Sequence, residues 1–573
     1  MKSSIGSETA EASANQYRRL IVLAVIGLVL FFVLQIMLPS LTNQSSDLPE
    51  GGMITKEQAA QKARQFADSV WGPGTEAGEP LVIYHSRSDF YGYLSKENLI
   101  GDYDKKWNRK YPYDVFRVQL KGAANGQDAA VDINMSSGQT VGFQVKSSDK
   151  NAARAAATED PAAKDMLMRI AESGMQLNEK EQLAGPVLKL FGYDPSQLEL
   201  MTGTDQSGLT YRVKDAAIGQ SRLELKFAFE QGAVTAFAPV FSVPAAHTQY
   251  VDDQTKLANW LYWIGYVVLT FILGVLAIVY SILTRHHTSF ARGAALSVIY
   301  FVVAMVGTLN MLPALQASGT TGGILVFGMI IQAMYTLVMA VILYLSLVGG
   351  DGLWRKQGRN LWLRASEPGF ASYTLHSMYR GYLWALILLG VQSVIFVILQ
   401  LTIHTWSTTD ETQSPYNTIY PWLMPILAWM AGIGEEGVYR LFGIPMLKKI
   451  VRSTFVASLL SSLIWAFGHT LYPIYPVSTR PIELAIIGLL FSFVFLRYGF
   501  ATVVFSHVVF DSVLMGISLI AMGDAVNVIA GIFWIVLPAI VGYVIYRFNR
   551  NRKFAPQQPA VQPYGTAGPG TVE

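Results

Sequence analysis

Residues 419–447 read IYPWLMPILAWMAGIGEEGVYRLFGIPML and place two adjacent carboxylates, Glu435 and Glu436, near the middle of an apolar run. Arg440 follows in the same run. The run is long enough to cross the hydrocarbon layer of a membrane as a helix. Charged side chains inside a bilayer are costly, so each one requires a structural or chemical reason. This segment therefore predicts a membrane protein whose intramembrane charges have a structural or chemical role.

The composition of the whole chain agrees with a membrane protein. Of 573 residues, 51% are apolar and only 14% are charged, whereas a soluble domain has about a quarter charged residues. Residues 40–258 are polar and mixed, and most of 259–546 is apolar. We therefore expect a water-exposed domain beside a membrane domain. The chain has no cysteine, which excludes disulfides, thiol catalysis and thiolate metal sites.

Apolar segments recur along the chain at lengths that suit membrane spans. The predicted spans are 20–38, 260–283, 293–315, 323–348, 381–403, 419–447, 454–472, 482–496, 500–521 and 525–546. The predicted fold class is therefore an α-helical polytopic membrane protein with about ten transmembrane helices and an extracytoplasmic α+β domain. We interpret 20–38 as an uncleaved anchor, because no small-x-small cleavage site is clear.

The charges that flank these segments predict their orientation. When ten spans are threaded alternately, the basic flanking residues between Arg285 and Lys553 fall on one side, with Arg480 as the exception. Acidic residues lie in the opposite loops, and these are Asp410, Glu411, Glu483 and Asp524. The positive side faces the cytoplasm. We therefore expect a multi-pass cell-membrane protein with both termini cytoplasmic and residues 40–258 extracytoplasmic.

The water-exposed domain contains two similar parts. Thr55 and Asn178 each open a helical stretch with an N-cap pattern. In each part, strand-like runs then flank a turn that contains glycine. We predict repeats at 54–147 and 165–243, joined by a polar linker. The first repeat loosely resembles a PepSY-type module, and the alternative is a generic α+β domain.

The remaining boundaries follow from composition. Residues 1–39 hold a short cytoplasmic N-terminus and the anchor, and 40–258 form the extracytoplasmic domain. Residues 259–546 form the membrane core. Residues 554–573 are rich in Pro, Gly and Gln, so we expect 547–573 to form a disordered cytoplasmic tail.

Two further spans carry ionisable side chains. The span 454–472 contains Trp465 and His469, and the span 500–521 contains His507 and Asp511. Side chains four residues apart share a helix face, which applies to Glu436 with Arg440 and to His507 with Asp511. Any one of these residues alone is explained equally well by a structural hydrogen bond. All six together predict one shared site.

The order of these motifs resembles a known family. An EExxxR motif, an aromatic residue four positions before a histidine, and HxxxN or HxxxD are the signature of the CAAX protease/bacteriocin-processing (CPBP) family. This family includes the type II CAAX prenyl endopeptidases. The motifs lie within 415–525, and 259–546 would be the protease core. Trp465 stands where the family usually has Phe, and Asp511 stands where the eukaryotic members have Asn.

The resemblance implies a role for each residue. Glu435 would be the general base that activates a water molecule for attack on a peptide carbonyl. His469 and His507 would orient that water and stabilise the oxyanion. Glu436 would bond to one of the histidines, and Arg440 would pair with a carboxylate. Asp511 would fix the tautomer of His507 or share a proton with it.

A metal site is the competing mechanism. Two histidines and a carboxylate form a common zinc set, which here would be Glu435, His469 and His507. The HExxH pattern that supplies two ligands and a base from one helix is absent. We therefore favour water activation without a cofactor, with zinc as the alternative.

The predicted function is an intramembrane endopeptidase that hydrolyses membrane-associated peptides or proteins with glutamate-activated water. The large outside domain suggests a bacterial protein, so we do not expect prenylated substrates. One alternative is a non-catalytic bacteriocin-immunity or peptide-binding receptor. Another is a proton-coupled transporter, although no inverted repeat is apparent. Expected partners are the substrate, the lipid bilayer and an envelope partner of the outside domain. No basic stripe predicts nucleic-acid binding.

Overall fold

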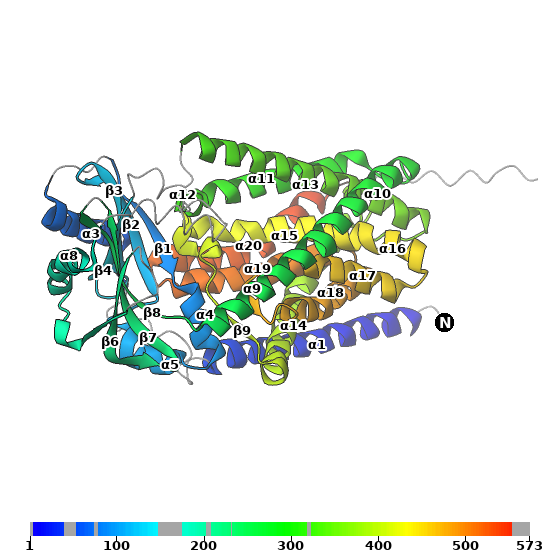
Figure 1. The fold of residues 1–573 in the computed structure, drawn as a ribbon. Coiled ribbons are helices and arrows are strands. Elements are labelled where there is room, and N and C mark those ends of the chain that lie inside the picture. Colours follow the sequence, from blue (N-terminus) through cyan, green and yellow to red (C-terminus); the bar gives the residue numbers. More distant parts are fainter. Residues whose placement is uncertain are drawn as a thin grey trace, which may run out of the picture.

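The protein consists of a bundle of long helices and an antiparallel sheet domain at one end of that bundle (Figure 1). The computed structural model describes residues 4–38, 53–73, 78–146, 175–201, 208–230, 232–317 and 322–552. The predicted linker, the first ten residues of the second predicted repeat and most of the predicted C-terminal tail lie outside the described residues. The N-terminal end of the first helix lies at the end of the bundle away from the sheet.

Eight helices in the described ranges are long and apolar enough to cross a membrane. They are α1 (Ser4–Phe32) with η1 (Val33–Met37), α9 (Ala245–Trp260) with η4 (Leu261–Val268) and α10 (Leu269–Leu283), α11 (Phe290–Asn310), α13 (Gly322–Lys356), α14 (Phe370–Ile403), α18 (Thr479–Tyr498), α19 (Phe500–Ala521) and α20 (Ala525–Asn549). A multi-pass helical membrane protein is therefore confirmed. Residues 245–258, predicted to be part of the α+β domain, instead begin the long α9–α10 helix.

Two of the ten predicted spans are not among these eight helices. The segment 419–447 is divided into η7 (Pro421–Ile426), α15 (Leu427–Glu435), the π-helix η8 (Glu436–Gly443) and α16 (Ile444–Val451). The segment 454–472 forms α17 (Thr454–Phe467), which has 14 residues and is therefore only about 21 Å long. The count of ten spans stays a prediction. These two irregular segments carry most of the predicted site.

The break at η8 has a local cause. Pro445 has no backbone N–H, so the carbonyl of Leu441 loses its normal α-helical partner. The indole Nε1 of Trp354 on α13 donates to that carbonyl instead, at 3.0 Å. Similarly, the hydroxyl of Ser461 on α17 donates to the carbonyl of Tyr439 at 2.5 Å. Backbone groups at membrane depth must be satisfied within the protein, so α13 and α17 hold the irregular segment in place.

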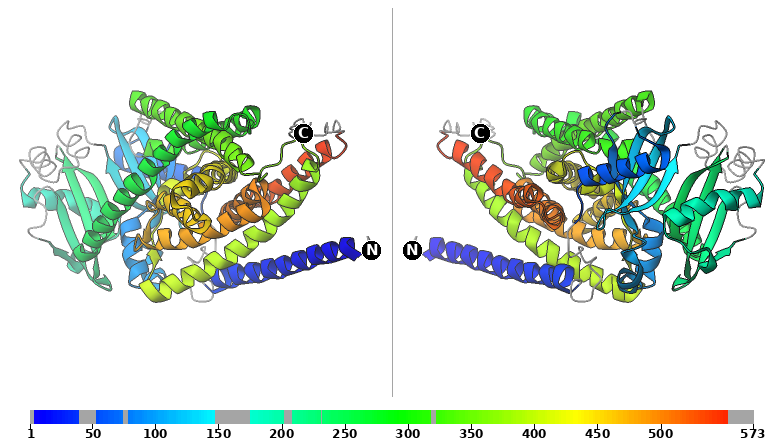
Figure 2. Two further views of the ribbon diagram at one scale, coloured as in Figure 1. Left: turned by 90° about the vertical axis from the view of Figure 1, so that its right-hand side faces the viewer. Right: turned by 90° about the vertical axis from the view of Figure 1, so that its left-hand side faces the viewer.

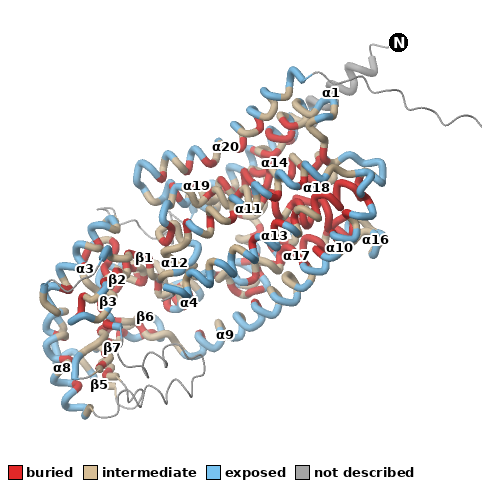
Figure 3. Tube along the Cα trace, turned by 90° about the horizontal axis from the view of Figure 1, so that it is seen from above, coloured by how far each residue is buried: buried red, intermediate tan, exposed pale blue. Residues whose placement is uncertain are grey.

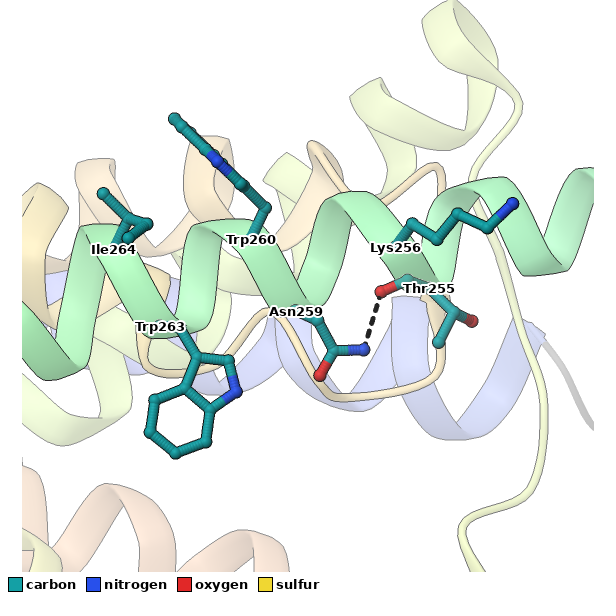
Figure 4. Close-up of a pocket in the computed structure, with 6 residues that line it drawn as sticks. All are labelled: Thr255, Lys256, Asn259, Trp260, Trp263 and Ile264. Carbon is teal, nitrogen blue, oxygen red and sulfur yellow. Dashed lines mark hydrogen bonds between the residues drawn. The ribbon is translucent and has the colours of Figure 1, made fainter. Parts of the chain in front are cut away.

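The buried residues concentrate between the helices, and the outward faces of the bundle are exposed and apolar (Figure 3). On the sheet-domain side, Trp260 and Trp263 project from α9 and η4 beside a shallow surface hollow, close to Lys256 (Figure 4). Their side chains are 62% and 58% exposed. Exposed Trp and Lys side chains are typical of the membrane–water interface. These residues predict a membrane boundary near residue 260 on this side.

Basic side chains gather at the end of the bundle away from the sheet. Arg292 and Arg355 lie 2.9 and 3.0 Å from the buried carboxylate of Asp351, and Arg364 lies 3.6 Å from it. The predicted cytoplasmic orientation of this end stays a prediction. Glu483, predicted to lie in a loop on the opposite side, is instead buried within α18. There it accepts hydrogen bonds from Arg480 and Gln392, because a carboxylate in an apolar bundle requires partners.

The sheet is antiparallel and has eight strands in the order β1-β2-β3-β4-β8-β7-β6-β5. The strands are β1 (Leu81–Ser86), β2 (Asp114–Ala124), β3 (Gln127–Asn134), β4 (Thr140–Val145), β5 (Leu198–Leu200), β6 (Leu209–Ile218), β7 (Ser221–Glu230) and β8 (Ala233–Phe241). The order is symmetrical about the β4–β8 pair, where Phe143 faces Phe237. The duplication stays a prediction, which this symmetry supports.

A helix precedes each half of the sheet. Helix α3 (Lys56–Trp71) begins with the predicted capping box of Thr55 and Gln58. Helix α8 (Leu177–Leu190) is capped by Gln176 and Glu179, so the predicted cap at Asn178 is wrong by two residues. Alanines 59, 63 and 67 of α3 and Ala184 of α8 are buried against the sheet. The first half also contains α4 (Ser88–Lys96), α5 (Ile100–Tyr103) and η2 (Asp104–Asn108) between β1 and β2.

The loop between α14 and α15 joins the sheet domain to the bundle. The side chain of Asn417 accepts a hydrogen bond from the backbone N–H of Tyr84 on β1 at 2.7 Å. It also donates to the backbone carbonyl of Tyr84 at 2.8 Å. Asn417 thus bonds to this exposed edge strand as a neighbouring strand would, which also protects the edge. Glu411 accepts a further bond from the N–H of Ser86.

The N-terminal helix α1 lies along the outside of the bundle beside α14 (Figure 2). Gly27 of α1 and Gly390 of α14 meet at the crossing, and a Cβ atom added at either would clash with the backbone of the other helix. Small residues at such crossings let membrane helices pack closely. The predicted tail begins later than expected, because residues 547–549 belong to α20.

We predict that Gly390→Leu separates α1 from α14, because the added side chain has no space at the crossing. The expected loss is about 1–3 kcal/mol of stability, measured as a lower thermal unfolding midpoint in detergent. Gly328→Leu on α13 is the matched control, because no atom lies within 4 Å of its Cβ position. Equal midpoints for the two variants would contradict the packing role.

We predict that Asn417→Ala loosens the sheet edge, because it leaves the N–H and C=O of Tyr84 without their partner. Amide hydrogen exchange should become faster in β1 and remain unchanged in β7. The control is Asn259→Ala, whose side chain bonds only to the carbonyl of Thr255 on its own helix. Unchanged exchange in β1 would show that the contact between the α14–α15 loop and β1 does not depend on Asn417.

Candidate active site

The structure brings all six predicted site residues into one connected cluster. Glu435 lies 3.7 Å from His507 and 4.0 Å from His469. Glu436 lies 2.7 Å from His507 and 3.0 Å from Arg440. Asp511 lies 3.5 Å from His507. The cluster therefore joins η8 and the end of α15 to α17 and α19.

The inner part of the cluster is closed to solvent. Glu436 and Arg440 are fully buried, and the side chain of His507 is 5% exposed. One oxygen of Glu436, Oε1, accepts hydrogen bonds from Arg440 Nη1 and from His507 Nδ1. The guanidinium of Arg440 also lies 4.4 Å from the ring centre of Trp465, which suits a cation–π contact. The ring of Phe491 stacks on His507 at 4.7 Å.

These contacts fix the tautomer of His507. Because Nδ1 lies 2.7 Å from a carboxylate, it carries the proton that is donated to Glu436. The other nitrogen, Nε2, faces the carboxylates of Glu435 and Asp511. Of the two roles predicted for Asp511, fixing the tautomer thus falls to Glu436. Asp511 stands where it could share a proton with Nε2.

The outer part of the cluster is partly open. The side chains of Glu435, His469 and Asp511 are 26%, 18% and 19% exposed. The indole of Trp465 donates to Glu435 Oε2. His469 Nδ1 donates to the backbone carbonyl of Trp465 at 3.1 Å, which leaves Nε2 directed at Glu435 Oε1. A 4.0 Å separation between two polar atoms is suited to a bridging water molecule.

Local backbone structure separates the two adjacent carboxylates. Glu435 ends α15 and Glu436 begins the π-helix η8, and such wide turns are frequent at functional sites. Glycines around this point let other helices approach closely. A Cβ at Gly432 would meet Val508 of α19, and one at Gly434 would meet the ring of Tyr300 on α11.

Two aromatic residues, Trp465 and Phe491, contact the cluster but are not among the six predicted site residues. Trp465 was noted as the aromatic residue of the motif, but its bond to Glu435 was not predicted. Its position four residues before His469 in the same predicted span was the available signal. Phe491, from α18, has no polar group or motif that could have marked it. Its place beside His507 follows only from helix packing.

A metal site requires several ligand side chains that converge on one point. In the ranges that the structure describes, no three His, Asp or Glu side chains converge closely enough to hold a metal ion. Glu435 uses different oxygens toward His469 and His507. A zinc ion on these three residues would therefore require side-chain rearrangement.

Comparison with known proteins adds to this geometry. Residues 417–513 match the family described as "Type II CAAX prenyl endopeptidase Rce1-like", and this range contains all six site residues. The chain is also 22% identical over 209 residues to the sporulation-killing factor biosynthesis protein SkfC of Bacillus subtilis (strain 168). That similarity covers 36% of this chain and 40% of the relative, so the chain spans about two-fifths of the length of that relative. No solved structure matches the chain.

The predicted resemblance to CAAX and bacteriocin-processing proteases is therefore confirmed for the C-terminal region. The family match supports a membrane protease in general terms. The PepSY-like character of the sheet domain stays a prediction, and so do the individual catalytic roles.

We predict that Arg440→Met destabilises the protein by about 3–5 kcal/mol, because it leaves the buried carboxylate of Glu436 without its cation. The double variant Glu436→Gln/Arg440→Met should recover part of this loss, because both charges are then removed. Thermal unfolding in detergent measures both effects. Arg497→Met, at an exposed position, is the control. Additive losses in the double variant would show that the pair is not coupled.

Proposed function

We propose that this protein is an intramembrane endopeptidase that hydrolyses membrane-associated peptides or proteins with water activated by Glu435. The observation that carries the proposal is the position of Glu435. Its carboxylate lies at the boundary between a closed charge cluster and a partly open space shared with His469 and Asp511. A general base needs both access to water and fixed neighbours.

In the proposed reaction, a water molecule sits between Glu435 Oε1 and His469 Nε2. Glu435 takes one proton from it as the water oxygen attacks the peptide carbonyl carbon. With a proton on Nε2, His507 donates a hydrogen bond to the oxyanion that forms. The proton on Glu435 then passes to the leaving nitrogen as the C–N bond breaks. Asp511 is placed to share the proton of His507.

The closed part of the cluster supports this chemistry without taking part in it. The Glu436 carboxylate, held by Arg440, sets the ring of His507 so that Nε2 faces the open side. A donor that is already oriented needs little reorganisation during the reaction. Trp465 holds Glu435 in a similar way.

The alternatives to this function have less support. No contact specifically favours a non-catalytic receptor or a proton-coupled transporter. If the enzyme uses zinc, Glu435, His469 and His507 would hold it, and the metal would supply Lewis-acid activation of water. We further propose that the sheet domain is extracytoplasmic and that both termini are cytoplasmic. A peptide or membrane-anchored protein would be the substrate.

The test is cleavage of a library of fluorogenic and membrane-anchored peptides by the purified protein in liposomes. Glu435→Gln should lower kcat by about 10²–10⁴-fold, because it removes the general base while keeping the shape of the side chain. His507→Ala should also lose activity. Asp524→Asn, at the N-cap of α20, is a control whose activity should not change.

A chelator separates the two proposed mechanisms. Activity that survives a strong chelator supports glutamate-activated water without a metal. Activity that is lost with chelator and restored by zinc supports the metal alternative. If wild type and Glu435→Gln cleave the peptides at equal rates, the catalytic proposal is wrong.

A further inference from the structure

A cavity of about 520 Å³ lies between the sheet domain and the helical bundle. One wall comes from the start of α4 in the sheet domain, with Ser88, Asp89 and Gly92. A second comes from the start of α9, with His247. The loops 406–412 and 471–475 of the bundle complete it. Neither domain forms this cavity alone.

Three carboxylates lie in the lining of the cavity, among hydroxyl and apolar side chains. They belong to Asp89, Asp410 and Glu411. Glu411 pairs with His85 at 3.0 Å. Asp410 accepts only from Thr412 and Gln413 of its own loop, and Asp89 accepts from the N–H of Phe90. Among the described residues, no Lys or Arg pairs with Asp89 or Asp410. Arg87 and Lys96 are near enough to interact electrostatically with Asp89 and with His247, respectively. The negative lining thus has cations nearby, although none is paired with Asp89 or Asp410 in the described structure.

A second, independent observation points to a ligand. His247 lines the cavity and is only 4% exposed, yet neither ring nitrogen has a hydrogen-bond partner in the described structure. Buried polar groups are normally satisfied, so an exception calls for a partner from outside the chain. The ring lies against Trp406, which itself stacks on Tyr475 at 4.5 Å. Aromatic faces beside carboxylates suit the binding of a cation.

One loop runs from the candidate active site into the wall of the cavity. Leu471 and Pro473 in its wall follow His469 by two and four residues, and the ring of His469 stacks on Tyr472 at 5.7 Å. This loop is fixed to the opposite wall, where β9 (Trp406–Ser407) pairs with β10 (Ile474–Tyr475). A peptide at the active site could therefore extend into the cavity.

We propose that this cavity binds a cationic group of the substrate, on the part of the peptide that lies outside the membrane on the sheet-domain side. The group is an ammonium or guanidinium, which is either the N-terminal amine or a Lys or Arg side chain. The inference rests on the proposed protease function and gives the sheet domain a role in substrate selection. The carboxylates of Asp89 and Asp410 receive the charge, and His247 and Trp406 line the space beside it.

Photo-crosslinking to the full-length protein in lipid nanodiscs tests binding separately from cleavage. The exposed side chain of Leu471 is replaced by p-benzoylphenylalanine in a Glu435→Gln background. The probe is a C-terminally biotinylated, leucine-rich peptide that spans the bilayer and carries one lysine beside an acetylated N-terminus. A second probe has norleucine in place of lysine, and a third has norleucine with a free N-terminal amine.

The charged probes should label the protein about tenfold more than the acetylated norleucine probe, because charge-assisted contacts are the stronger ones. Preference for the lysine probe identifies a side-chain cation, and preference for the free-amine probe identifies the N-terminus. Asp89→Asn and Asp410→Asn should lower labelling to the level of the neutral probe. Asparagine replaces aspartate well at the cap position of Asp410, and its side-chain oxygen can keep the bond from the N–H of Phe90 at Asp89, so both segments should keep their structure.

Asp253→Asn is the matched control, because this exposed carboxylate on α9 pairs with Lys256 outside the cavity. Its labelling should equal that of the parent protein. Equal labelling by charged and neutral probes, or an equal effect of Asp253→Asn and Asp410→Asn, overturns the proposal. A third outcome separates the two proposals. If labelling depends on charge but the wild-type protein, which keeps Glu435, cleaves none of the peptides, the binding site stands and the protease function is contradicted.

Discussion

The buried carboxylate of Glu436 is the constraint on which the rest of the site depends. An ionised group with no exposure to solvent is tolerated only when it is paired and hydrogen-bonded. Arg440 and His507 meet this requirement on one oxygen, Oε1, whereas Oε2 has no hydrogen-bond partner among the described residues. Their positions in turn fix the approach of η8 to α19, and the guanidinium determines where Trp465 can pack. The orientation of His507 follows directly from this pairing.

The irregular backbone around Glu436 is the second consequence of placing chemistry inside a membrane. A regular helix satisfies its own backbone groups, whereas η8 depends on side chains from α13 and α17. These external bonds hold the segment rigidly between neighbouring helices. Non-helical backbone at membrane depth is tolerated where it is buried in protein. The same arrangement separates a closed, orienting half of the cluster from an open half that could meet a substrate.

The sheet domain is attached to the loops that leave the site rather than suspended from a linker. Asn417 and Glu411 bond to the edge strand β1, and the loop after His469 pairs with the loop that leads into α15. The walls of the intervening cavity therefore come from elements that also carry the site. This connection is the physical basis of the proposal that the sheet domain takes part in substrate selection.

The sequence by itself determined the membrane class and predicted the six residues that cluster in the structure, because long apolar runs favour the bilayer and charges within them are too costly to occur without partners. It also predicted the partnership of Glu436 with Arg440, because four-residue spacing places side chains on one helix face. Only the tertiary structure decided that Glu436 rather than Asp511 sets the tautomer of His507, and that Phe491 packs beside it. Those outcomes depend on how separate helices pack, and the spacing within one helix carries no information about distances between helices. For the same reason, the cavity around His247 could not be predicted, since its walls come from four segments distant in the chain.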